Sequence, residues 1–160
     1  MARGSGPHED SSVLTSAAQM NRATNQAANL VGGAAPSIVL VERDRHICDL
    51  VTLFLKRVGF DVERAETGYI GLDRVRRLGH AIVITEILVP ELDGLALCRL
   101  LKGDPALRVG VIVLSMLSAA ERARQAGADA FLMKPIEEDR LVSTANDIRR
   151  KLSSESRSIT

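Results

Sequence analysis

The stretch Ala81–Gly94 reads AIVITEILVPELDG, a short apolar run followed by acidic residues, a proline and a glycine. The run Ala81–Thr85 is rich in β-branched residues and stops at the carboxylate of Glu86, which is typical of a buried strand that ends at the edge of a sheet. Asp93 stands directly before the glycine and can cap the helix that follows. A buried strand followed closely by a helix indicates a parallel α/β sheet.

Three more apolar runs stop at polar residues in the same way. They are Ser37–Val41 before Glu42-Arg43-Asp44, Val111–Leu114 before Ser115, and Phe131–Met133 before Lys134-Pro135. Ligands of a parallel sheet bind beyond the carboxyl ends of its strands, which meet at one edge. We therefore expect two carboxylates, a hydroxyl and a lysine to converge there.

The remaining pattern predicts the helices and one weaker strand. Apolar residues recur every three or four positions from Ile47 to Val58, and Gly59 ends that helix. Further along the chain we expect a strand at Asp61–Ala65, a helix capped by Thr67, a very short helix with a Ser118/Glu121 capping box, and a last helix at Ile136–Leu152. Five alternations of strand and helix predict a doubly wound, five-stranded parallel sheet of the flavodoxin-like class.

Composition agrees with one small cytoplasmic domain. The chain has 160 residues, 46% of them hydrophobic, which suffices for a single core. Its net charge of +1 gives no reason to expect binding to nucleic acid or to an anionic membrane, and no window has the length of a membrane-spanning helix. Cys48 and Cys98 fall on helical patterns and are expected to be reduced, at or near the core.

The chain divides into three parts. Residues 1–36 are rich in Ala, Ser, Asn, Gln and Gly and have no aromatic residue, so we expect a disordered or partner-docking extension. Residues 37–152 carry the strand and helix pattern and form the domain, and residues 153–160 are expected to be a flexible tail.

Residues 37–152 resemble the receiver domain of two-component response regulators. The likeness rests on the acidic position after the first strand, on the carboxylate before Ile87-Leu-Val-Pro90 and Leu92-Asp-Gly94, and on Ser115, Gly127-Ala-Asp129, Phe131 and Lys134-Pro135. The resemblance implies the (βα)5 receiver fold and roles for the residues at the carboxyl edge. In that family an aspartate accepts a phosphoryl group from a histidine kinase, and two acidic residues hold a magnesium ion. A Ser or Thr and a lysine contact the phosphoryl group, and an aromatic residue near the fifth strand reports the change.

The family's roles fall on named positions of this chain. Glu86 stands at the phosphoacceptor position, Glu42 and Arg43 at the acidic pair, Ser115 and Phe131 at the switch pair, Lys134 at the phosphate-contacting lysine, and Pro135 at a cis-proline turn. Two of these residues depart from the family: glutamate replaces the aspartate, and arginine replaces an acid. Arg43 cannot donate an electron pair to a metal ion, so magnesium binding is doubtful and we expect no cofactor.

Counting charges predicts a pocket that neutralises itself. Glu42 and Glu86 are balanced formally by Arg43 and Lys134, and the guanidinium of Arg43 is expected to occupy the space of the ion and pair with Glu86. Asp44 is a weak candidate for a displaced metal ligand together with Glu42, although an aspartate at that place more often caps a helix. Glu86 itself is open to three interpretations: a nucleophile, a permanent substitute for phospho-aspartate, or a structural carboxylate.

These observations predict a single-domain atypical response regulator, not an enzyme, that acts by protein contact and without phosphorylation. Its partner would be a histidine kinase or a downstream regulator, and the oligomeric state stays open. The alternative is an unconventional receiver that is still phosphorylated or metal-regulated in a phosphorelay. A small-ligand or catalytic flavodoxin-like domain is a lesser alternative, because no glycine-rich phosphate loop follows the first strand.

Overall fold

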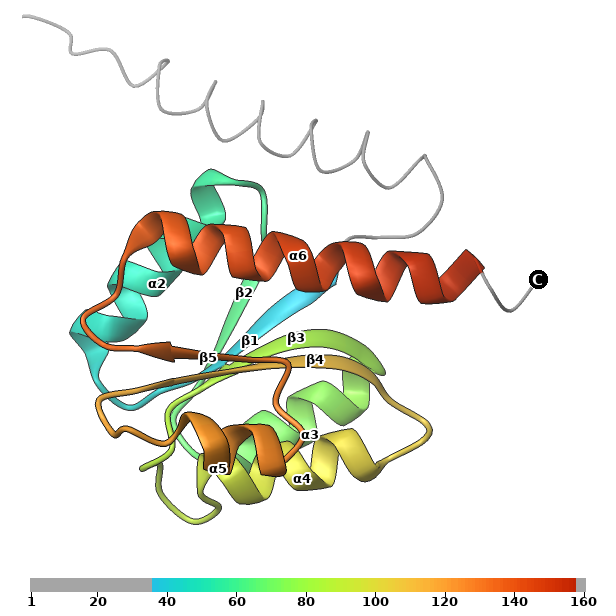
Figure 1. Ribbon diagram of the computed structural model, residues 1–160, viewed down its shortest axis with the longest axis horizontal. Coiled ribbons are helices and arrows are strands. Elements are labelled where there is room, and N and C mark those ends of the chain that lie inside the picture. The colour runs from blue at the N-terminus through green and yellow to red at the C-terminus, as the bar shows by residue number, and fades with distance from the viewer. Residues whose placement is uncertain (1–35, 158–160) are drawn as a thin grey trace, which may run out of the picture. The chain divides into compact units, whose positions relative to one another are not determined.

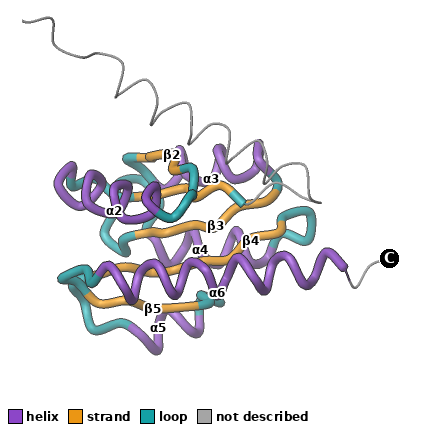
Figure 2. The backbone as a smooth tube through the Cα atoms, turned by 90° about the horizontal axis from the view of Figure 1, so that it is seen from above, coloured by secondary structure: helices purple, strands orange, loops and turns teal. Residues whose placement is uncertain are grey.

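The computed structural model describes residues 36–157, which form one five-stranded sheet with helices on both faces (Figure 1). The strands are β1 (Ser37–Val41), β2 (Val62–Ala65), β3 (His80–Thr85), β4 (Arg108–Ser115) and β5 (Ala130–Met133). All neighbouring strands are parallel, in the order β2-β1-β3-β4-β5, and Figure 2 shows them side by side. The predicted doubly wound fold is confirmed. Nearly all of the extension expected at residues 1–36 lies outside the described residues.

The two faces of the sheet carry separate apolar cores. Helices α2 (Arg45–Arg57) and α6 (Glu138–Arg157) cover one face, and α3 (Gly68–Leu78), α4 (Gly94–Gly103) and α5 (Ala120–Gln125) cover the other (Figure 1). Along β1, Ile38 and Leu40 belong to the first core, and Val39 and Val41 belong to the second. This alternation of a fully buried strand explains why the strands read as continuous apolar runs in the sequence. No helix among residues 36–157 is long and apolar enough to cross a membrane.

Three of the expected helix caps are present. Asp44 accepts hydrogen bonds from the backbone of His46 and Ile47, Thr67 accepts one from Ile70, and Asp93 accepts from Leu95 and Ala96. The capping box at Ser118 is wrong, because the N-cap residue of α5 is Ala119, whose side chain cannot accept a bond. The very short helix itself is confirmed, since α5 has six residues.

The last helix is longer than the sequence predicts. Helix α6 continues to Arg157, so the expected end of the last helix at Leu152 is wrong and residues 153–157 are helical. A contact from far away in the chain lies at this end of the helix. Arg108 of β4 donates hydrogen bonds to the Leu152 carbonyl and to Ser156 Oγ, which links the last turns of the helix to the sheet.

Candidate functional site

The carboxyl ends of the strands bring four polar residues together. Glu42 follows β1, Glu86 follows β3, Ser115 is the last residue of β4, and Lys134 follows β5. Val41 is paired with Thr85 and Ser115 with Met133, whereas Thr85 is paired with Val113, so β4 and β5 reach two residues further along the sheet than β1 and β3. Backbone bonds extend the ladder by one step on each side: Glu86 N donates to the Val41 carbonyl at 3.0 Å, and Lys134 N donates to the Ser115 carbonyl at 3.0 Å.

Lys134 lies between the two carboxylates. Its ammonium donates to Glu42 Oε2 at 2.8 Å and to Glu86 Oε2 at 2.8 Å. The three side chains are 11%, 6% and 11% exposed, in the order Lys134, Glu42 and Glu86. Burial alone would lower the pKa of Lys134, but the bonds to the two carboxylates outweigh it, and the pKa of Lys134 lies above its ordinary value.

Glu86 is held at both of its oxygens. Oε1 accepts a hydrogen bond from Ser115 Oγ at 2.5 Å and one from the Ile87 backbone at 2.6 Å, while Oε2 accepts from Lys134. Burial alone would raise the pKa of Glu86, but the bonds from Lys134, Ser115 and Ile87 lower it more, so the carboxylate stays ionised. Gly94 permits this geometry, because a Cβ at Gly94 would lie 2.1 Å from the Glu86 carbonyl oxygen.

Glu42 connects the loop that follows β1 to Lys134 through hydrogen bonds. Its Oε1 accepts hydrogen bonds from the backbone N–H groups of Arg43 and Asp44, at 2.8 and 2.9 Å, and its Oε2 is taken by Lys134. Both oxygens are therefore engaged within the protein. Asp44 is engaged as well, because its Oδ1 caps helix α2, and hydrogen bonding to these amides lowers the pKa of Asp44.

Arg43 lies away from the cluster, and the expected Arg43–Glu86 pair is wrong. Its side chain is exposed and forms no ion pair with any carboxylate of residues 36–157. The tight loop explains this, because Glu42 turns back to bond the amide of Arg43 and the next side chain faces solvent. The buried cluster accordingly holds two carboxylates and one ammonium. One negative charge is therefore not neutralised, and a hydroxyl and three backbone N–H groups stabilise the two carboxylates together with the ammonium.

The other residues singled out in the sequence take separate places. Phe131 is partly buried and packs against the core beneath α3, α4 and α5, and the Lys134–Pro135 peptide bond is cis as predicted. Cys48 and Cys98 are free and buried, as expected. The sequence did not reveal the contribution of backbone amides, above all Ile87 N–H. The Asp93-Gly94 pair was the only local signal that the main chain approaches closely there.

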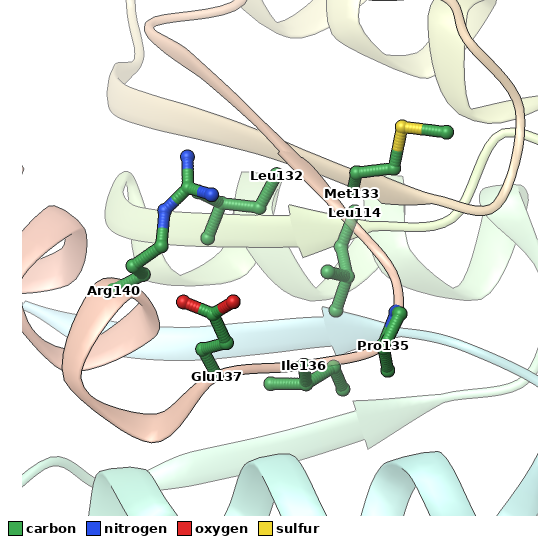
Figure 3. Close-up of a pocket in the computed structure, with 7 residues that line it drawn as sticks. All are labelled: Leu114, Leu132, Met133, Pro135, Ile136, Glu137 and Arg140. Carbon is green, nitrogen blue, oxygen red and sulfur yellow. The ribbon is translucent and has the colours of Figure 1, made fainter.

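A small apolar pocket lies beside the site without belonging to it. It is formed where β5 leads into α6, and its lining residues are Leu114, Leu132, Met133, Pro135, Ile136, Glu137 and Arg140 (Figure 3). None of the four clustered polar side chains lines it. The chemistry of the carboxyl edge and this pocket are therefore separate features.

The residues present do not fit a magnesium site. Magnesium is usually bound by one or two free carboxylates, and water or phosphate oxygens complete its near-octahedral coordination. Here both carboxylates bond the Lys134 ammonium, Asp44 caps a helix, and Arg43, which follows Glu42, is exposed and has no electron pair to donate to a metal. Among the residues that the structure describes, no three His, Cys, Asp or Glu side chains are grouped so as to hold a metal ion.

Comparison with known proteins identifies the family. Residues 38–146 match the response regulator receiver domain, so the chain belongs to the receiver domains of two-component signal transduction. It is 30% identical over 112 residues to the polar-differentiation response regulator DivK of Brucella ovis, covering 68% of this chain and 91% of DivK. It is 39% identical over 84 residues to a gliding motility regulatory protein of Myxococcus xanthus, covering 50% of this chain but only 11% of that longer protein.

A solved structure agrees in fold. The receiver domain of a signal transduction histidine kinase from Syntrophus aciditrophicus is 33% identical, with a TM-score of 0.66 over 73% of this chain and 92% of the other. The fold and the family expected from the sequence are confirmed.

Proposed function

We propose that this receiver domain acts by protein contact and without phosphorylation, with Glu86 in the place of the phosphoacceptor aspartate. The observation that carries the proposal is the double anchoring of Glu86 by Ser115 Oγ at 2.5 Å and by Lys134 Nζ at 2.8 Å. These residues stand at the positions of the two groups that contact the phosphoryl group in the family. The extra methylene of glutamate lets an unmodified carboxylate reach both.

The state of the site supports a permanent substitute for the phosphorylated acceptor. Ser115 Oγ donates to the Glu86 carboxylate, and Phe131 is partly buried against the core of its face, which is the inward arrangement that the proposal requires of the switch pair. Glu86 reproduces only part of the charge of a phosphorylated acceptor, because a carboxylate carries one negative charge and a phosphate carries about 1.5 to 2. We infer an active-like arrangement that no kinase turns on or off.

The same geometry argues against phosphotransfer to Glu86. Both carboxylate oxygens are bonded, and a displacement of roughly 1 Å costs on the order of 100-fold in a positioned reaction. No catalytic step and no cofactor are needed for a domain that acts by contact. We expect it to work in the cytoplasm on a histidine kinase or a downstream regulator.

Intact-mass analysis after incubation with a small phosphodonor and magnesium tests the proposal. We expect no phosphoryl adduct, either in the unmodified chain or in Glu86→Asp, because Lys134, Glu42 and Arg43 still leave no metal site. Adding Arg43→Asp to Glu86→Asp restores a second acid and should give measurable labelling. Stoichiometric labelling of the unmodified chain that disappears in Glu86→Ala would overturn the proposal.

A further inference from the structure

Exposed apolar side chains surround the buried cluster. Leu88, in the loop after β3, is 71% exposed, and Met116, the residue after Ser115, is 74% exposed. Leu117 and Met133 are 39% and 47% exposed. We call these four residues the edge patch. Each lies within two positions of Glu86, Ser115 or Lys134, so the patch directly adjoins the site.

The edge patch forms a row across neighbouring strands. Strands β3, β4 and β5 are adjacent in the sheet, and Ser115 is paired with Met133, which sets Met116 beside the end of β5. Figure 3 shows the Met133 side chain extending from the end of β5 away from Ile136 and Glu137. Apolar side chains at three adjacent strand ends, two of them methionines, offer an adaptable surface for an apolar partner.

On the β1 side of the edge patch lie the exposed side chains of two arginines, Arg43 and Arg45. Strand β1 is the next neighbour of β3, and Arg43 and Arg45 in the loop and helix after β1 are exposed and form no ion pair within residues 36–157. Asp44 between them caps α2 through Oδ1 and keeps its negative charge, so this segment carries two guanidinium groups and one carboxylate. A partner that covers the patch therefore meets unpaired guanidinium groups at one end.

We propose that the carboxyl edge binds an amphipathic helix of a partner protein that carries acidic residues at one end. The spacing of the strands supports a helix laid across them. Four adjacent strand ends span about 14 Å at roughly 4.8 Å per strand. A helix covers that length in about ten residues, with one turn of roughly 5.4 Å per strand. Successive turns then place an acidic residue over Arg43 and apolar residues over the patch.

This inference rests on the proposed function, because a site that exchanged phosphate and magnesium with solvent could not be kept covered. The two can still fail separately. Phosphodonor labelling tests the state of Glu86, whereas peptide binding tests the edge patch, and neither result determines the other.

The probe is a helical peptide of about 15 residues with three leucines one turn apart on one face and two glutamates in the end turn. Its affinity is measured by fluorescence anisotropy and its position by backbone amide shifts of the labelled chain. We expect binding with shifts centred on residues 43, 88, 116 and 133. A matched peptide with lysines for the glutamates should bind about tenfold more weakly, and the difference should shrink in high salt.

Variants separate the two halves of the surface. Leu88→Ser and Met116→Ser should each weaken both peptides about tenfold, whereas Arg43→Gln should remove most of the preference for the acidic one. Leu53→Ser on α2 and Leu100→Ser on α4 are matched controls, 48% and 45% exposed, and should change nothing. No binding, no preference for glutamate, shifts on α2 or α4, or self-association of the chain through the patch would each overturn the proposal.

Discussion

Replacing Lys134 by methionine removes the only buried cation of the site and is the sharpest test of its electrostatics. The ammonium bonds two carboxylates at 2.8 Å each, and the three side chains are 6–11% exposed. Methionine has a similar length and no charge, so Lys134→Met leaves two buried carboxylates facing each other without a counter-ion. Loss of one partner from a buried charge pair costs about 3–5 kcal/mol of unfolding free energy. That is a large part of the total stability of a small domain.

The unfolding free energies of the unmodified chain and of Lys134→Met should change in opposite directions as the pH falls. In the unmodified chain the pKa of Glu86 is lowered, so its contribution is complete above the unfolded-state pKa and is lost as the pH falls through the folded-state pKa. In Lys134→Met, burial and repulsion from the second carboxylate should raise the pKa of Glu86. The variant should therefore regain stability between pH 7 and pH 5, where the unmodified chain does not.

Urea unfolding followed by circular dichroism at several pH values measures both quantities. Lys102→Met is the control, because Lys102 pairs with a single carboxylate, Asp129, at 3.0 Å and both side chains are a quarter or more exposed. That variant should lose only about 1 kcal/mol. Adding Glu86→Gln to Lys134→Met should restore part of the stability. A loss no larger than that of Lys102→Met would refute the reasoning and indicate that Arg43 turns inward to replace the lysine.

Three further predictions concern the packing and the chemistry around the site. Gly110→Ala should destabilise the fold by about 1–3 kcal/mol in urea unfolding, because the added Cβ would lie 2.1 Å from Ile148 Cγ2. The control is Gly103→Ala, whose Cβ would have nothing within 4 Å and which should be neutral or stabilising by up to about 1 kcal/mol. Cys98, whose pKa is raised by burial to about 11, should resist a thiol reagent at pH 8 in the folded chain and react at once in urea; rapid reaction of the native protein would contradict its burial. Arg43→Gln should change the unfolding free energy by less than about 0.5 kcal/mol, since the side chain is exposed and unpaired within the described residues, and a larger loss would show that it contributes to the cluster.

The meeting of the four polar side chains could be predicted from the sequence, because it depends only on strand ends. Each apolar run stops at the residue that reaches the carboxyl edge, and parallel strands bring those residues to the same edge of the sheet whatever the helices do. The caps at Asp44, Thr67 and Asp93 are equally local, and they were found for that reason.

The predictions were wrong or incomplete where a long-range contact or a loop conformation determines the position of a side chain or the end of a helix. Arg43 follows the acidic residue directly, and the sequence does not show that Glu42 turns back to bond its amide and directs the next side chain outward. The last turns of α6 are bonded by Arg108, which is 44 positions from Leu152. The anchoring of Glu86 by Ile87 N–H is a main-chain contact that no residue type signals.

A crystal structure grown from magnesium-rich solution tests the central claim most directly. It should show Glu86 bonded to Ser115 Oγ and Lys134 Nζ, Glu42 bonded to the same lysine, and no metal ion between them. The account would be contradicted by a magnesium ion held by Glu42 and Asp44 with Lys134 displaced from Glu86. The chain would then be a metal-binding receiver with an unusual acceptor.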